Sequence, residues 1–210
     1  MILNLLKRHR KPEGRDLLDP TPRPAVDWII ANNERPLTTR RIGRINTPEG
    51  RIAIIDPMVH IEGEFIDVPT TGCDMVHFRD SDGMPSKLAL VFADAPVAWG
   101  RRVSWCAVDS VSIAPVTPTT LEALNRYQAD IGPDASLYEH FFEQFACEDA
   151  PDARLPSGAH LPYIVAPDDG SYPVCELRSA GDDLVAVFID LMGRSEEYQD
   201  WLIPREPETT

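Results

Sequence analysis

The sequence predicts an α+β fold, mostly antiparallel β-sheet with a sandwich-like arrangement and two helices inserted before the last three strands. Two observations lead to this prediction. Short apolar or alternating segments, separated by turn residues, fill residues 41–113 and return at 163–189. Between them lie two stretches with helical spacing, at 118–129 and 134–145. With 43% hydrophobic and 26% charged residues in 210, the chain has the composition of a globular protein that can bury a real core.

The N-terminal part differs in composition from the rest. Residues 12–24 contain four prolines, which block helix formation and indicate a linker. The apolar run 27–31 predicts a short helix that ends before Pro36. We therefore expect a basic, proline-rich N-terminal arm with a short helix over 1–40, a single α+β domain over 41–203 and a polar tail over 204–210.

The first strands of the domain are predicted from alternation and turns. Residues 41–47 alternate, 48–50 form a turn and 51–55 return as a strand, so we expect a hairpin. A strand over 71–79 and a polar turn follow, and the almost uninterrupted apolar run 87–92 predicts a central strand. Two further short strands are expected at 97–105 and 107–113.

The second half is predicted to contain the helices and the last strands. A threonine that resembles an N-cap precedes Pro118 and the first helix, and the second helix places Leu137 and three phenylalanines on one face. The last three strands are expected at 163–166, 172–177 and 184–189. Residues 179–183 would link the final two as a hairpin.

Charge is distributed unevenly in this chain, whose formal net charge is −14. Residues 1–51 carry 11 Lys and Arg against 6 Asp and Glu, whereas residues 52–210 carry 9 against 28. An acidic body repels phosphates, so we expect no nucleic-acid partner. No stretch approaches the roughly 20 apolar residues of a membrane-spanning helix, so no span is expected either. The same charge attracts a basic protein partner, although it is equally compatible with plain solubility.

The four cysteines, Cys73, Cys106, Cys147 and Cys175, are far apart in the sequence. No pair has the spacing of a zinc site or a redox motif, and dispersed cysteines among apolar residues are typical of core packing. This usage predicts a reducing cytoplasmic location.

Common catalytic motifs are missing from the sequence. It has neither a glycine-rich phosphate loop nor the Gly-x-Ser-x-Gly or His-Glu-x-x-His pattern. We interpret Trp99 and Trp105 as core or rim residues, because a stacking platform needs basic neighbours and only Arg101 and Arg102 are near. We expect no cofactor, and no residue is assigned as catalytic or as a metal ligand.

One segment is nevertheless rich in possible metal ligands. Asp56, His60, Glu62, Glu64 and Asp67 lie within twelve residues, and oxygen ligands with one imidazole suit Mg²⁺ or Mn²⁺. In an extended segment, His60, Glu62 and Glu64 would share one face. A solvated strand face has the same pattern, so both interpretations stay open.

Four segments carry a family resemblance. They are the glycine, strand and Asp-Pro of 50–57, the strand and Pro-Val-x-Trp of 87–99, Val108-Asp109 with its neighbours, and the Gly-x-Tyr-Pro-Val at 170–174 with the strand 184–190. In these segments the chain resembles the bacterial domain-of-unknown-function family 4241, over about residues 45–191. Pro167-Asp168, Ser110 and Leu191 depart from the family pattern.

The resemblance implies a placement of residues but no activity, since the family has none assigned. Asp109, Asp169 and Asp190 are the acids in the matched segments that could converge on one pocket. With Asp56 and His60 they form the alternative acid cluster, the set that a metal-assisted enzyme of unknown reaction would use.

The leading hypothesis is a noncatalytic binding protein, and its concrete form is a bacterial immunity protein that neutralises a basic toxin partner. Its acidic surface loops would steer and hold the lysine and arginine side chains of the partner. The expected partner-binding residues are Glu62, Glu64, Asp67, Glu148, Asp149 and Asp152. The metal-assisted enzyme is the second hypothesis. A regulatory module whose basic arm at 7–15 docks elsewhere is the third.

Overall fold

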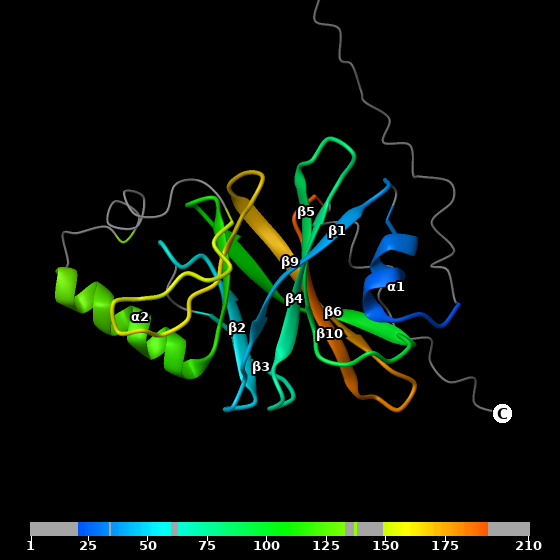
Figure 1. Cartoon of the computed structure of the whole chain (residues 1–210), viewed down its shortest axis with the longest axis horizontal. Coiled ribbons are helices and arrows are strands. Elements are labelled where there is room, and N and C mark those ends of the chain that lie inside the picture. The colour runs from blue at the N-terminus through cyan, green and yellow to red at the C-terminus, as the bar shows by residue number, and fades with distance from the viewer. Residues whose placement is uncertain (1–20, 34, 60–62, 133–136, 138–148, 193–210) are drawn as a thin grey trace, which may run out of the picture.

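Two antiparallel sheets, packed face to face, form the centre of the computed structural model of this chain (Figure 1). The structure describes residues 21–33, 35–59, 63–132, 137 and 149–192. The larger sheet has the order β1 (Thr38–Ile45), β4 (Cys73–Arg79), β5 (Pro85–Val91), β10 (Leu184–Asp190), β9 (Gly170–Arg178) and β6 (Trp99–Val108). The smaller sheet has the order β3 (Ile66–Asp67), β2 (Arg51–Ile55), β7 (Ser112–Val116) and β8 (Ile164–Val165). The predicted α+β class with mostly antiparallel sheet is confirmed.

The six-stranded sheet is apolar on both faces because it lies between two layers. Leu88 and Leu90 of β5 pack with Ile113 and other residues of the smaller sheet, in the core between the sheets. Ala89, with Phe188 of β10, belongs to a second core on the opposite face. Successive side chains of a strand point to opposite faces, so this arrangement needs the unbroken apolar run of β5. The prediction that this strand is central is confirmed.

Each sheet has a helix on its outer face, and Figure 1 shows the two helices at opposite sides of the sheets. The α1 helix (Ala25–Ala31) buries Trp28 and Ile29 against the six-stranded sheet. The α2 helix (Pro118–Ile131) buries Leu124 against the four-stranded sheet. As predicted, Thr117 caps α2, and its hydroxyl oxygen accepts a hydrogen bond from the Thr120 amide. The short helix assigned to the N-terminal arm is therefore part of the core.

The predicted hairpin over 41–55 is wrong. The turn exists, with the Gly50 amide bonded to the Thr47 carbonyl at 2.9 Å, but β1 pairs with β4 and β2 pairs with β3 and β7. The buried Thr47 hydroxyl donates to the Pro69 carbonyl at 2.5 Å and accepts from the Gly72 amide at 3.1 Å. These bonds hold the point where the chain crosses from one sheet to the other, which turn chemistry alone does not reveal.

Two strands do lie where they are predicted at 97–105 and 107–113, but with other bounds, because β6 continues to Val108 and β7 begins only at Ser112. The break between the two strands spans residues 109–111, where Val111 has a φ of 56°. The polar turn before β5 and the hairpin that joins β9 to β10 are confirmed. The predicted helix 134–145 lies outside the described residues except for Leu137, which is buried and helical.

Across the part of the chain that the structure describes, the helices are too short or too polar to cross a membrane.

Candidate functional site

Asp56, the first acid of the alternative cluster, has a structural role. It is fully buried at the end of β2, and its carboxylate accepts four hydrogen bonds. The donors are the Met58 amide at 2.9 Å, the Asp109 amide at 2.8 Å, and the amide and hydroxyl of Ser110 at 2.7 and 2.5 Å. Asp56 therefore anchors the turn between β6 and β7, next to the strained backbone of Val111.

The other acids of that cluster do not meet in one place. Asp109 and Asp169 are exposed and lie just beyond the last pair of the β6–β9 ladder, Val108 with Gly170. Asp190 is level with residue 173 of β9, so it lies about 13 Å from Asp169 along the strand direction. It is fully buried and forms an ion pair with Lys87.

Metal ligation finds no support among the described residues. Within them, no group of three or more His, Cys, Asp or Glu side chains is arranged to hold a metal ion. His60 and Glu62 lie outside the described residues. The expected face of His60, Glu62 and Glu64 therefore stays a prediction.

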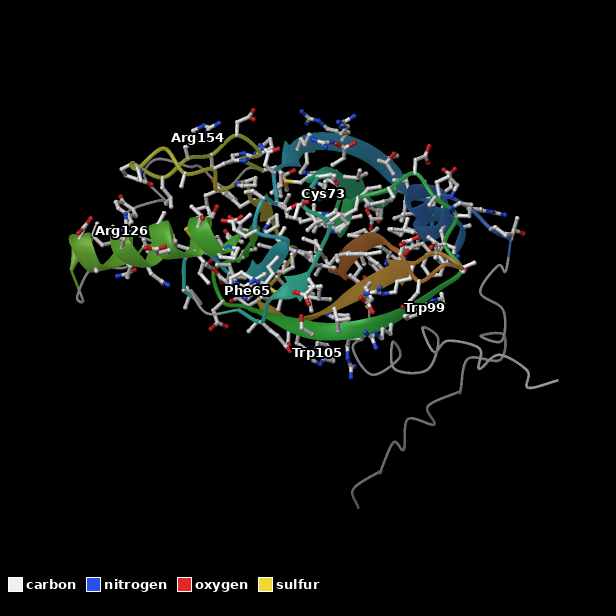
Figure 2. The ribbon with its side chains drawn as sticks, turned by 90° about the horizontal axis from the view of Figure 1, so that it is seen from below. Phe65, Cys73, Trp99, Trp105, Arg126 and Arg154 are labelled. Atoms are coloured by element: carbon white, nitrogen blue, oxygen red, sulfur yellow. The ribbon has the colours of Figure 1, made fainter. Side chains whose placement is uncertain are left out.

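The predicted partner-binding acids divide between the two edges of the smaller sheet. Glu64 and Asp67 are exposed at the β3 edge, whereas Asp149 and the exposed Asp152 lie beyond β8. Two strands separate β3 from β8, a distance of roughly 14 Å. Figure 2 shows the same division, with Phe65 and Arg154 on different sides of the molecule. Glu148, like Glu62, lies outside the described residues.

Asp149 is held inside a network rather than presented to solvent. One carboxylate oxygen accepts from His77 Nδ1 at 2.9 Å and from Arg79 at 3.0 Å, and the other accepts from the Val165 amide at 3.0 Å. Burial alone would raise the pKa of Asp149, but these donors outweigh burial and lower it to about 2. Asp149 therefore ties the β8 edge of one sheet to β4 of the other.

Thiol chemistry is disfavoured at the described cysteines. Cys73, Cys106 and Cys175 are free and buried. Burial raises the pKa of each thiol to about 12, so the reactive thiolate form is rare at neutral pH.

The most distinctive surface runs along β6, one edge of the six-stranded sheet. Figure 2 shows Trp99 and Trp105 along this strand. Arg101 donates to the buried Glu176 at 2.5 Å, and Arg178 of β9 donates to the same carboxylate at 2.9 Å. Both guanidinium groups lie over the Trp99 ring, at 5.8 and 5.7 Å from its centroid. Hydrogen bonding to Glu176 raises the pKa of Arg178 further.

Arg102 and Trp105 form a second pair on the same strand. The Arg102 guanidinium lies 4.5 Å from the centroid of the Trp105 ring, and Trp105 is 39% exposed. In a regular strand, side chains three residues apart point to opposite faces. Here a β-bulge between Arg102 and Ser104 adds one residue, so Arg102 and Trp105 stand opposite residues 175 and 173 of β9 and share a face.

Sequence reasoning named these residues but missed their arrangement. The expectation of a core or rim role fits Trp105, which lies at the rim. The pairing of each tryptophan with arginine depends on the bulge and on the partner strand β9, and neither is visible in the sequence of β6.

Comparison with known proteins gives no match to a protein-family model, to a curated protein or to a solved structure. The resemblance to family 4241 therefore stays a prediction.

Proposed function

We propose that this chain is a noncatalytic protein-binding protein, in its concrete form an immunity protein of a bacterium that neutralises a basic toxin partner. The observation that carries the proposal is the division of the charged residues. The buried acids among the described residues are bonded within the fold, whereas Glu64, Asp67 and Asp152 are exposed on a chain with net charge −14.

The four buried acids of the described residues each have partners within the chain, and Asp80 accepts from the Asp82 and Met84 amides. Asp56 holds a turn, Glu176 holds two arginines and Asp190 pairs with Lys87. A carboxylate committed in this way is not available as a general base or a metal ligand without loss of stability. The metal-assisted alternative therefore has no observation in its favour among the described residues.

Exposed acids support long-range attraction of a basic partner. A field of one sign raises the rate of encounter and weakens with salt. Because the predicted acids lie on two separate edges, we propose Glu64 and Asp67 at the β3 edge as the steering pair, with Asp152 contributing from the far side. The free thiols of Cys73 and Cys106 support the proposed cytoplasmic location.

The test is affinity capture of the tagged chain from the lysate of its native host, at low and at high salt, with mass spectrometry. The proposal predicts one stoichiometric basic partner whose recovery falls as salt rises. Glu64→Lys with Asp67→Lys should reduce capture at low salt by about tenfold. Glu122→Lys with Asp130→Lys, an equal charge change on the exposed side of α2, is the matched control. Failure to capture any partner at both salt concentrations would contradict the proposal.

A further inference from the structure

The β6 strand is an edge of the six-stranded sheet. β6 has ten residues and pairs with β9 on one side. Within the described residues no strand pairs with its other side. An edge strand of this length presents a row of backbone donors and acceptors that an extended peptide can use.

Arg102 provides a local charge at this edge. None of the carboxylates in the described part of the chain forms an ion pair with it, and its Nη1 atom is buried without a hydrogen-bond partner. A buried guanidinium donor without an acceptor is costly. That atom is covered by the chain itself, but Arg102 as a whole is only half-buried, so its positive charge would attract a carboxylate from outside.

Trp105 provides an apolar surface beside that charge. It is the large aromatic side chain that the described structure leaves most exposed, at 39%. Tryptophan and arginine are the residues that contribute most often to the binding energy of protein interfaces. The bulge that places Arg102 and Trp105 on one face creates a compact contact, with a cation and an aromatic ring beside a free strand edge.

We propose that the free side of β6 takes an acidic, extended segment of a protein partner as an added strand, with a carboxylate on Arg102 and an apolar side chain over Trp105. This inference rests on the proposed protein-binding function and specifies its docking contact. Overall charge governs the approach of the partner, while the edge governs the docked contact, so a basic partner can dock through an acidic segment.

Charge favours this occupant over a second copy of the chain. Two copies, each with a net charge of −14, repel one another, and each would bring Arg101 and Arg102 to the shared edge. An acidic segment instead meets charges of the opposite sign.

The test uses a displayed library of random 12-residue peptides, selected for binding to the full chain. The proposal predicts enriched peptides that combine Asp or Glu with β-branched or aromatic residues. Their affinity should fall at least tenfold on Arg102→Gln and on Trp105→Ala. Arg40→Gln, which removes an exposed arginine from the opposite edge strand β1, should leave the affinity unchanged.

Several results would overturn the inference. They are a selection without enrichment, enriched peptides that are basic, and peptides that bind Arg102→Gln as tightly as the unmodified chain. A dimer in size-exclusion chromatography that Trp105→Ala dissociates would assign the edge to a second copy. Circular dichroism and thermal unfolding establish that each variant is folded. Because the library contains no host protein, this test can fail while affinity capture still finds a partner, and the reverse also holds.

Discussion

The two edge strands of the six-stranded sheet, β1 and β6, share one structural feature that has a different effect in each strand. Each has a one-residue bulge that brings side chains three positions apart onto one face. In β1 the bulge directs Arg41 and Arg44 to the carboxylate of Asp74, at 2.6 and 3.1 Å. In β6 it sets Arg102 over Trp105, without a carboxylate from the described chain. The arginines at the bulge are thus neutralised in β1, whereas Arg102 of β6 has no carboxylate partner among the described residues.

In these two strands the role of an arginine depends on its partner and not on its residue type. Charges bonded within the chain should matter for stability, and charges without such a partner should matter for binding.

The ion pair of Lys87 and Asp190 lies in the middle of the sheet and should give the largest effect. Replacement of one member, Asp190→Leu, should lower the free energy of unfolding by about 3–5 kcal/mol, because a buried lysine loses its carboxylate. The double variant with Lys87→Met should recover most of that loss. Urea unfolding measures both, and a double variant no more stable than the single one would place the cost elsewhere.

Asp56 should give the next largest effect. In Asp56→Asn an NH2 donor replaces one carboxylate oxygen, so two of the four hydrogen bonds that Asp56 accepts are lost, which should cost about 2–3 kcal/mol. Asp169→Asn, an exposed acid at the neighbouring strand end, is the control and should change stability by less than about 0.5 kcal/mol. Equal losses in chemical denaturation would show that Asp56 is not the anchor of this turn.

The link between the two sheets at Asp149 should depend on pH. Its pKa in the folded chain, about 2, lies below the ordinary 3.8, so the charged form stabilises the fold above pH 4. This stability disappears as the pH falls from 4 to 2. Asp149→Asn should therefore cost about 2 kcal/mol at pH 7 and almost nothing at pH 2. Unfolding curves at the two pH values check this, and a loss independent of pH would rule out the charge as its cause.

The two edges themselves should give the smallest effects on stability and the sharpest contrast. Arg41→Gln breaks an exposed ion pair and should cost up to about 1 kcal/mol, less at high salt. Arg102→Gln should cost less than about 0.5 kcal/mol, because no ion pair is lost among the described residues. It should nevertheless weaken partner binding, while Arg41→Gln should not. Thermal unfolding and a binding titration on the same samples measure both effects. Weaker binding by Arg41→Gln, together with a larger loss of stability in Arg102→Gln, would contradict the division.

Much of the fold could be predicted because local chemistry decides it. Thr117 and Pro118 indicate the start of α2, and the apolar run of β5 predicts a central strand. The crossing of the chain between sheets could not be predicted, because it depends on contacts of Thr47 with residues more than twenty positions away.

The candidate site could be predicted less well, because it too depends on contacts between residues that are distant in the sequence. The sequence indicates Asp56 and Asp190 as candidate acids, but their partners Ser110 and Lys87 lie 54 and 103 residues away along the chain. The pairing of Arg102 with Trp105 follows from a bulge, which changes the face of every later side chain in its strand. Alternation alone would place these two side chains on opposite faces.

The central claim is that surface acidity governs the approach of a protein partner and the β6 edge governs its retention. The most direct measurement is the association and dissociation rates of the captured partner at 50 and 500 mM salt, for the unmodified chain and for Trp105→Ala. The account predicts that salt slows association and that Trp105→Ala speeds dissociation at least tenfold without a change in association. Association that is independent of salt, together with unchanged dissociation from Trp105→Ala, would contradict it.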